Sequence, residues 1–138
     1  MDWTIAIIAG VVIVAFFIVK HISFVSEEAA RKYLTQGALV IDVRSPEEFR
    51  SGHVPDAINL PLGELRDSLP RRVKDKHQVL LLHCLSGGRS HLARQQLRRL
   101  GYPNAFNLGS YARAEKIVRS VSNSHFDWPG NVTPGSGY

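Results

Sequence analysis

The sequence has very little sulfur, no internal repeat and, over its first nineteen residues, no basic side chain. Cys84 is the only cysteine among 138 residues, which excludes an intrachain disulfide and agrees with a reducing compartment. Residues 3–19 carry no charge of either sign. The apolar fraction of 44% and the charged fraction of 21% are otherwise ordinary, and the length allows one small globular domain with appendages.

The uncharged stretch at residues 3–19 has three possible interpretations. Seventeen helical residues span ~25 Å, at the lower end of what crosses a bilayer core. A cleaved signal peptide needs a positively charged start and a small-residue cleavage site, but Asp2 precedes this stretch and Lys20 and His21 follow it. A buried core helix needs a polar stripe, which the stretch lacks. We therefore expect a transmembrane signal anchor over residues 1–21 that remains in the mature protein.

The distribution of positive charge predicts how this anchor is oriented. Every lysine and arginine lies at or after Lys20, so the positive-inside rule predicts a single-pass protein of the inner or plasma membrane with its carboxy-terminal domain in the cytoplasm. The net charge of +5 could suggest nucleic-acid binding, but the basic residues are scattered among acids without interleaved aromatics. We expect no nucleic-acid partner and interpret the charge as a solvated face that can lie against anionic lipid.

After the anchor, short apolar runs alternate with helical patterns. This alternation predicts an α/β fold with a central parallel five-stranded sheet, helices on both faces and one preceding transmembrane helix. The expected strands are residues 22–25, 38–44, 57–61, 78–83 and 104–108. Helices are expected from the caps Ser26 and Ser45, over residues 63–73, from Ser90 and over 111–121. The domain therefore covers residues 22–121, and residues 122–138, rich in Ser, Asn, Gly and Pro, form a flexible tail.

The chemistry is concentrated where the most apolar strand ends. Cys84 closes that strand, and a glycine-rich loop leads directly into a helix. Backbone N–H groups converge at such a place, where the helix dipole also favours a thiolate over a thiol. The alternative is an inert core cysteine followed by an ordinary turn. Because of the loop context we expect Cys84 to be a nucleophile, held by the following residues: Leu85, Ser86, Gly87, Gly88, Arg89 and Ser90.

Other polar residues near these strand ends are given supporting or structural roles. Asp42 and Arg44 lie at the carboxyl end of a neighbouring strand, where sites form in parallel sheets, and we expect them to support the loop or to pair with Glu48. His83 is next to Cys84, but adjacent strand residues point to opposite faces, so we expect a packed side chain and not a base. The remaining histidines lack metal-ligand spacing, and we expect neither a metal nor a cofactor.

Three segments, in order, resemble the signature segments of single-domain rhodaneses. They are DVRSPEEF at residues 42–49, GHVPDAINLP at 52–61 and HCLSGGRS at 83–90. The resemblance covers nearly all of residues 22–121. It implies a sulfurtransferase in which Cys84 attacks a donor such as thiosulfate, becomes a persulfide and passes the sulfur to a thiol or to cyanide.

Two details of the loop bear on this resemblance. Four residues separate Cys84 from Arg89, whereas cysteine phosphatases on related scaffolds have five and so form a wider cradle. Leu85 stands where thiosulfate-preferring relatives often have a basic residue, which argues against strong thiosulfate turnover. The main alternative is a non-enzymatic rhodanese-like module that docks partners at the membrane; a cysteine phosphatase is the lesser one.

Overall fold

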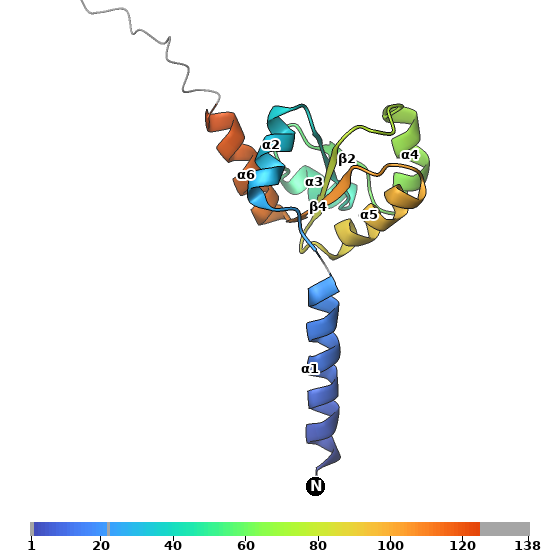
Figure 1. The fold of residues 1–138 in the computed structure, drawn as a ribbon, viewed down its shortest axis with the longest axis vertical. Coiled ribbons are helices and arrows are strands. Elements are labelled where there is room, and N and C mark those ends of the chain that lie inside the picture. Colours follow the sequence, from blue (N-terminus) through green and yellow to red (C-terminus); the bar gives the residue numbers. More distant parts are fainter. Residues whose placement is uncertain (1, 22, 125–138) are drawn as a thin grey trace, which may run out of the picture.

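The computed structural model describes residues 2–21 and 23–124. The order of elements follows the expected alternation (Figure 1). The helices are α1 (Trp3–His21), α2 (Glu27–Thr35), α3 (Pro46–Ser51), α4 (Leu65–Arg72), α5 (Gly88–Arg99) and α6 (Tyr111–Ser124). The strands are β1 (Leu39–Asp42), β2 (Ile58–Asn59), β3 (Leu80–Cys84) and β4 (Ala105–Ser110). Helix α6 thus reaches Ser124, and the rest of the expected tail lies outside the described residues.

The four strands form one parallel sheet in the order β2-β1-β3-β4. Strand β3 is central and buried along its whole length, as its run of leucines predicts. Its pairing with β4 shifts after Leu82, so that His83 pairs with Gly109 and Cys84 with Ser110. The carboxyl ends of β1 and β3 are neighbours, which brings Asp42 and Cys84 to the same edge.

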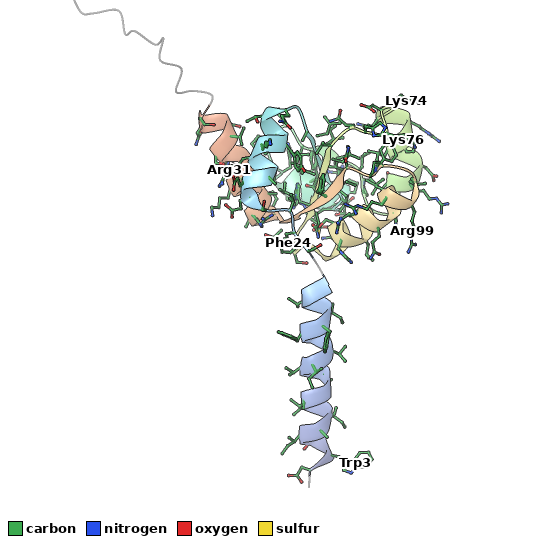
Figure 2. All side chains as sticks on the ribbon, viewed as in Figure 1. Trp3, Phe24, Arg31, Lys74, Lys76 and Arg99 are labelled. Carbon is green, nitrogen blue, oxygen red and sulfur yellow. The ribbon has the colours of Figure 1, made fainter. Side chains whose placement is uncertain are left out.

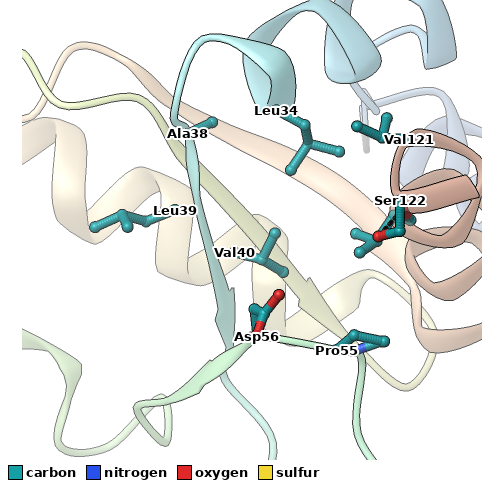
Figure 3. A pocket seen from close by; sticks show the side chains of 9 residues that line it. Leu34, Ala38, Leu39, Val40, Pro55, Asp56, Val121 and Ser122 are labelled. Carbon is teal, nitrogen blue, oxygen red and sulfur yellow. Dashed lines mark hydrogen bonds between the residues drawn. The ribbon is translucent and has the colours of Figure 1, made fainter. Parts of the chain in front are cut away.

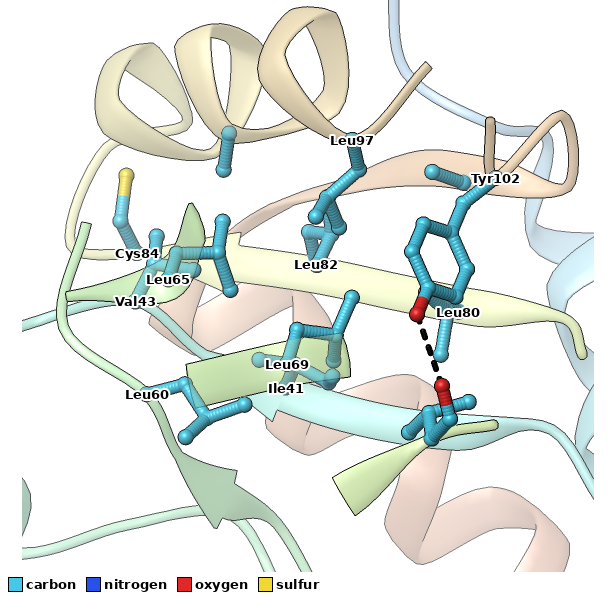
Figure 4. Close-up of a cluster of buried hydrophobic side chains, with 13 residues drawn as sticks. Ile41, Val43, Leu60, Leu65, Leu69, Leu80, Leu82, Cys84, Leu97 and Tyr102 are labelled. Atoms are coloured by element: carbon cyan, nitrogen blue, oxygen red, sulfur yellow. Dashed lines mark hydrogen bonds between the residues drawn. The ribbon is translucent and has the colours of Figure 1, made fainter. Parts of the chain in front are cut away.

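Helices cover both faces of the sheet, and the side chains of β3 divide between them. Leu80, Leu82 and Cys84 belong to the core on one face, whereas Leu81 belongs to the core on the other, as the alternation along a strand requires. The first core also includes Leu69 of α4, Leu97 of α5 and Tyr102, whose hydroxyl donates to the Val73 carbonyl (Figure 4). The second core contains side chains of α2 and α6.

The expected fifth strand is not present, because residues 23–25 are not a strand. This segment lies beside β4, where the Val25 N–H donates to the Asn107 carbonyl at 2.9 Å. The Val25 carbonyl instead accepts from the Arg113 guanidinium at 2.6 Å. A side chain thus occupies this carbonyl, and among the described residues the sheet has four strands. Ile22, the first residue of the expected strand, lies outside the described residues.

The predicted transmembrane anchor, and with it the predicted membrane location, is wrong. Among the described residues, no helix has the length and apolarity that crossing a bilayer needs. The uncharged part of α1, residues 3–19, spans only ~25 Å, which is shorter than the hydrocarbon core of a typical bilayer. The helical prediction itself is confirmed, and Figure 1 shows α1 extending away from the sheet and its covering helices.

Candidate functional site

Cys84 ends β3, and the chain turns into α5 within four residues. The turn depends on Gly87, which has a φ of 98° in the left-handed region. Helix α5 begins at Gly88, two residues before the expected start at Ser90. The turn directs the Gly87 N–H at the Cys84 Sγ, 3.0 Å away. Figure 4 shows the sulfur at the end of the core, pointing toward the start of α5. The side chain is only 1% exposed.

The loop compensates for the burial of this sulfur. Burial alone raises the pKa of the Cys84 thiol, because a thiolate loses its hydration. Hydrogen bonds from the backbone and hydroxyl of Ser90, and from the N–H groups of Gly87 and Ser86, outweigh burial and place the pKa below its ordinary value. The loop therefore favours negative charge on the sulfur.

Gly87 is required for a second reason, which involves the segment that follows α1. A Cβ at this position would lie 2.7 Å from the Phe24 ring, closer than a methyl group can approach. A Cβ at Gly109 would also lie 3.6 Å from the Phe24 ring, and the Arg113 guanidinium lies 5.5 Å from the centroid of that ring. Figure 2 shows Phe24 where the chain passes from α1 to the domain. The segment after α1 is thus packed against the back of the loop.

Arg89 does not point freely into solvent, because Glu48 of α3 holds it. Its two terminal nitrogens donate to the two Glu48 oxygens at 2.7 and 3.0 Å. Glu48 also accepts from the Ser45 N–H at 3.2 Å, and the Ser45 hydroxyl accepts from the Glu48 N–H, which completes a capping box. The bonds to Arg89 are the main reason why the pKa of Glu48 falls to about 2. They are also the main reason why the pKa of Arg89 lies above its ordinary value, to which the charge of Cys84 adds.

Asp42 and Arg44 form a buried ion pair and do not contact Cys84. The Arg44 guanidinium donates to Asp42 Oδ2 at 2.7 Å and to the Gly52 carbonyl at 2.7 Å. It also lies 4.6 Å from the centroid of the Tyr111 ring. The Asn59 amide donates to the carbonyls of both Asp42 and Arg44. This arrangement holds the turn between β1 and α3, and Glu48 pairs with Arg89 and not with Asp42 or Arg44.

His83 is packed, as its place in the strand predicts. Its side chain is fully buried, and neither ring nitrogen has a hydrogen-bond partner within the described part of the chain. Nε2 lies 3.8 Å from Asp42 Oδ2, and the ring lies 6.2 Å from that of Tyr111. Burial lowers the pKa of His83 below its ordinary value, which favours the neutral ring.

Ser90 connects the start of α5 to strand β4. Its hydroxyl lies 3.6 Å from the Cys84 Sγ, 3.1 Å from the Gly87 carbonyl and 2.7 Å from the Asn107 Oδ1. The Asn107 amide nitrogen donates to the same Gly87 carbonyl at 3.1 Å. Asn107 is 1% exposed and reaches the loop from 17 residues further along the chain.

The outer side of the loop exposes Leu85 and Ser86. Leu85 is 60% exposed, and its carbonyl accepts from the Tyr111 N–H. Ser86 forms an isolated bridge with Ser110 at the end of β4. Of the six predicted loop residues, Ser86, Gly87, Arg89 and Ser90 interact with the Cys84 sulfur, whereas Leu85 faces outward. Among the described residues, no three His, Cys, Asp or Glu side chains gather as a metal site requires.

Sequence reasoning missed two residues of this arrangement. Glu48 was expected to pair with Asp42 or Arg44, and its bond to Arg89 spans 41 residues. Asn107 was assigned only to a strand. A polar residue between Phe106 and Leu108 is a signal that the sequence did contain, because an amide inside a buried strand needs partners.

A pocket of about 250 Å³ lies elsewhere, between the end of α2, strand β1 and the end of α6 (Figure 3). Its walls include Leu34, Val40 and Val121, with Asp56 and Ser122 at the side. None of its lining residues belongs to the loop around Cys84, so this pocket is separate from the site described above.

Comparison with known proteins places the domain and the loop in one family. The model of the rhodanese-like domain matches residues 26–114. The chain is 38% identical over 69 residues to thiosulfate sulfurtransferase PspE of Escherichia coli (strain K12), covering 50% of this chain and 66% of PspE. It is 34% identical over 106 residues to protein YqhL of Bacillus subtilis (strain 168), covering 71% of this chain and 82% of YqhL. Among solved structures, the human single-domain sulfurtransferase TSTD1 matches with a TM-score of 0.57 and 32% identity, over 65% of this chain and 92% of that chain.

Proposed function

The chain belongs to the rhodanese-like family of sulfurtransferases and is a rhodanese-type enzyme, and from this premise we propose that Cys84 carries sulfur as a persulfide. The donor that we propose to test first is thiosulfate, because PspE and a second relative, GlpE of Pseudomonas syringae, are named thiosulfate sulfurtransferases. The observation that carries the proposal is the sulfur itself. It is buried, it accepts the Gly87 N–H at 3.0 Å, and its surroundings lower the pKa of the thiol.

In the first half-reaction, the Cys84 thiolate attacks the outer sulfur of thiosulfate. A bond forms between the two sulfur atoms, and the sulfur–sulfur bond of thiosulfate breaks. The bonding electron pair leaves with sulfite, so Cys84 holds a persulfide anion. This is covalent catalysis by a nucleophile that its surroundings have activated.

In the second half-reaction, a thiophile takes the outer sulfur. Cyanide or a thiolate forms a bond to it, the persulfide bond breaks, and its electron pair returns to the Cys84 sulfur. With cyanide the product is thiocyanate, and the thiolate is regenerated without any net change of charge. Two successive transfers through one covalent intermediate predict ping-pong kinetics.

The loop stabilises the charge in both halves. The N–H groups of Ser86, Gly87 and Ser90 are already oriented toward the sulfur, so they need no reorganisation when an anion forms there. Arg89 adds a positive charge whose position Glu48 determines. The exposed Leu85 adds none, and we therefore expect weak binding of the thiosulfate dianion.

The experiment is an intact-mass measurement on the full chain after incubation with thiosulfate. Because Cys84 is the only cysteine, a gain of one sulfur atom, ~32 Da, that is removed by cyanide assigns the persulfide to this residue. Cys84→Ala is the matched control and should gain nothing. If the folded wild-type chain gains no sulfur from thiosulfate or from a polysulfide, the proposal is wrong and a docking module becomes the better explanation.

A further inference from the structure

The Ser90 hydroxyl has one proton and three acceptors within reach. Asn107 Oδ1 is the nearest at 2.7 Å, the Gly87 carbonyl is at 3.1 Å and the Cys84 Sγ is at 3.6 Å. A hydroxyl donates a single hydrogen bond and rotates to the acceptor that attracts it most. With an uncharged thiol at Cys84, the geometry favours donation to Asn107.

Asn107 has a fixed orientation, because both ends of its amide are bonded. Oδ1 also accepts from the Gly109 N–H at 3.0 Å, and Nδ2 donates to the Gly87 carbonyl at 3.1 Å. The side chain is buried in the strand next to β3 and does not contact the sulfur through any bond in the structure. It acts on the loop only through Gly87 and Ser90.

We propose that Asn107 is a positioning residue that holds the Ser90 hydroxyl beside the Cys84 sulfur and competes with that sulfur for the hydroxyl proton. That this competition serves sulfur transfer at Cys84 rests on the proposed function. Ser90 donates to Asn107 while Cys84 is a thiol. It rotates to the sulfur when the sulfur carries the charge of a thiolate or persulfide. No covalent bond forms or breaks in this rotation.

The effect of Asn107 on the Cys84 sulfur is separate from that of the charged groups nearby. Arg89 is the charged side chain that interacts with Cys84, and Glu48 holds it from the opposite side. Asp42 is bonded to Arg44. Asn107 is neutral at every pH, so its effect on Cys84 comes from the proton of Ser90 and not from a charge.

The inference predicts a direction that a purely structural role does not. Asn107→Leu has a side chain of similar size and removes both the Oδ1 acceptor and the Nδ2 donor, which leaves the Ser90 proton to the more distant Gly87 carbonyl at 3.1 Å or to the sulfur at 3.6 Å. To donate to a thiolate, the Ser90 hydroxyl then gives up a weaker hydrogen bond than its bond to Asn107. The thiolate is therefore more stable relative to the thiol, and the pKa of Cys84 falls by about 0.5 to 1. If Asn107 only supported the loop, the sulfur would lose donors and the pKa would rise.

The test is the pH profile of Cys84 alkylation by iodoacetamide in the full chain. We expect Asn107→Leu to lower the pKa and Ser90→Ala to raise it, because the second change removes a donor to the sulfur. In the Ser90→Ala background, Asn107→Leu should no longer lower the pKa, because the hydroxyl proton is absent and only the bond from Nδ2 to the Gly87 carbonyl is lost. A rise in the single Asn107 variant, or an equal change in both backgrounds, overturns the inference.

Asn104→Leu is the matched control. Asn104 precedes the same strand, and its amide donates to the His77 carbonyl at 2.8 Å, away from the loop. We expect the same chemical change there to leave the pKa of Cys84 unaltered. Alkylation requires only a thiolate, so its outcome does not depend on the outcome of the mass test. If the pKa shifts appear but no persulfide forms, the proposed function fails and the role of Asn107 stands.

Discussion

At the scale of single residues, the ion pair between Glu48 and Arg89 makes the stability of the domain depend on pH. Glu48 has a pKa of about 2 in the fold, against an ordinary value of 4.5, chiefly because of Arg89. The unfolded chain therefore binds more protons than the folded chain between these two values. The contribution of the ion pair to the free energy of unfolding is complete above pH 4.5 and is lost as the pH falls toward 2.

Glu48→Gln tests this linkage. The variant cannot gain a proton at this position, so its free energy of unfolding should fall less steeply between pH 4.5 and pH 2 than that of the wild type. Urea denaturation at a series of pH values measures the slope. Glu47→Gln is the control, because its 3.3 Å pair with Arg50 is mostly exposed and solvent screens it. Equal slopes in the wild type and Glu48→Gln would contradict the assignment.

At the scale of elements, α2 and α3 have similar serine N-caps, and of these two only the cap of α3 includes a residue that bonds to Arg89. Ser26 caps α2, and Ser45 caps α3 within the capping box that includes Glu48. Both hydroxyls accept a backbone N–H at 3.2 Å. The two caps are locally alike, so their effects on stability should be similar and their effects on sulfur transfer should differ.

Ser45→Ala and Ser26→Ala should each lower the free energy of unfolding by about 1 kcal/mol, as the loss of a side-chain cap does. Only Ser45→Ala should also lower kcat/KM for the thiosulfate donor, because the Glu48 N–H loses the hydroxyl that holds the first turn of α3, and Arg89 then loses a fixed orientation. Urea denaturation and a thiocyanate assay measure the two quantities. An equal loss of activity in both variants would show that general destabilisation, and not the position of Arg89, is responsible.

At the scale of the whole molecule, the net charge of +5 affects encounters with an anion. A positive protein attracts the thiosulfate dianion over a distance that salt shortens, from a Debye length of about 20 Å near 20 mM to about 4 Å near 500 mM. We expect kcat/KM for thiosulfate to fall several-fold over this range. Alkylation of Cys84 by neutral iodoacetamide should hardly change and is the control. A parallel decline in both rates would point to a change in the protein itself.

Local patterns in the sequence were sufficient for much of the fold. The caps Ser26 and Ser45 marked helix starts correctly, because a capping bond reaches only a few residues along the chain. The leucine run placed Cys84 at the end of a buried strand, with His83 and Cys84 on opposite faces. Both results follow from the geometry of a single element.

Contacts between elements could not be predicted in this way. The sequence contains Glu48, Arg89 and Asn107, but nothing in their spacing indicates that α3 and β4 both reach the loop after β3. The fifth strand failed for a similar reason, since the Arg113 guanidinium that takes the Val25 carbonyl comes from α6. For α1, the uncharged apolar run predicted a helix correctly, and the membrane role inferred from the same run was wrong.

The sequence by itself determined the helices, four of the strands, the position of the single sulfur and the loop that holds it, because these depend on residues that are neighbours along the chain. Only the tertiary structure decided which side chains restrain that loop. Glu48 fixes Arg89, Asn107 holds Ser90, and Phe24 packs on Gly87. The physical reason is that strand order and helix packing bring together groups that lie 17 or more residues apart along the chain. The bonds between these groups depend on distances that no local pattern contains.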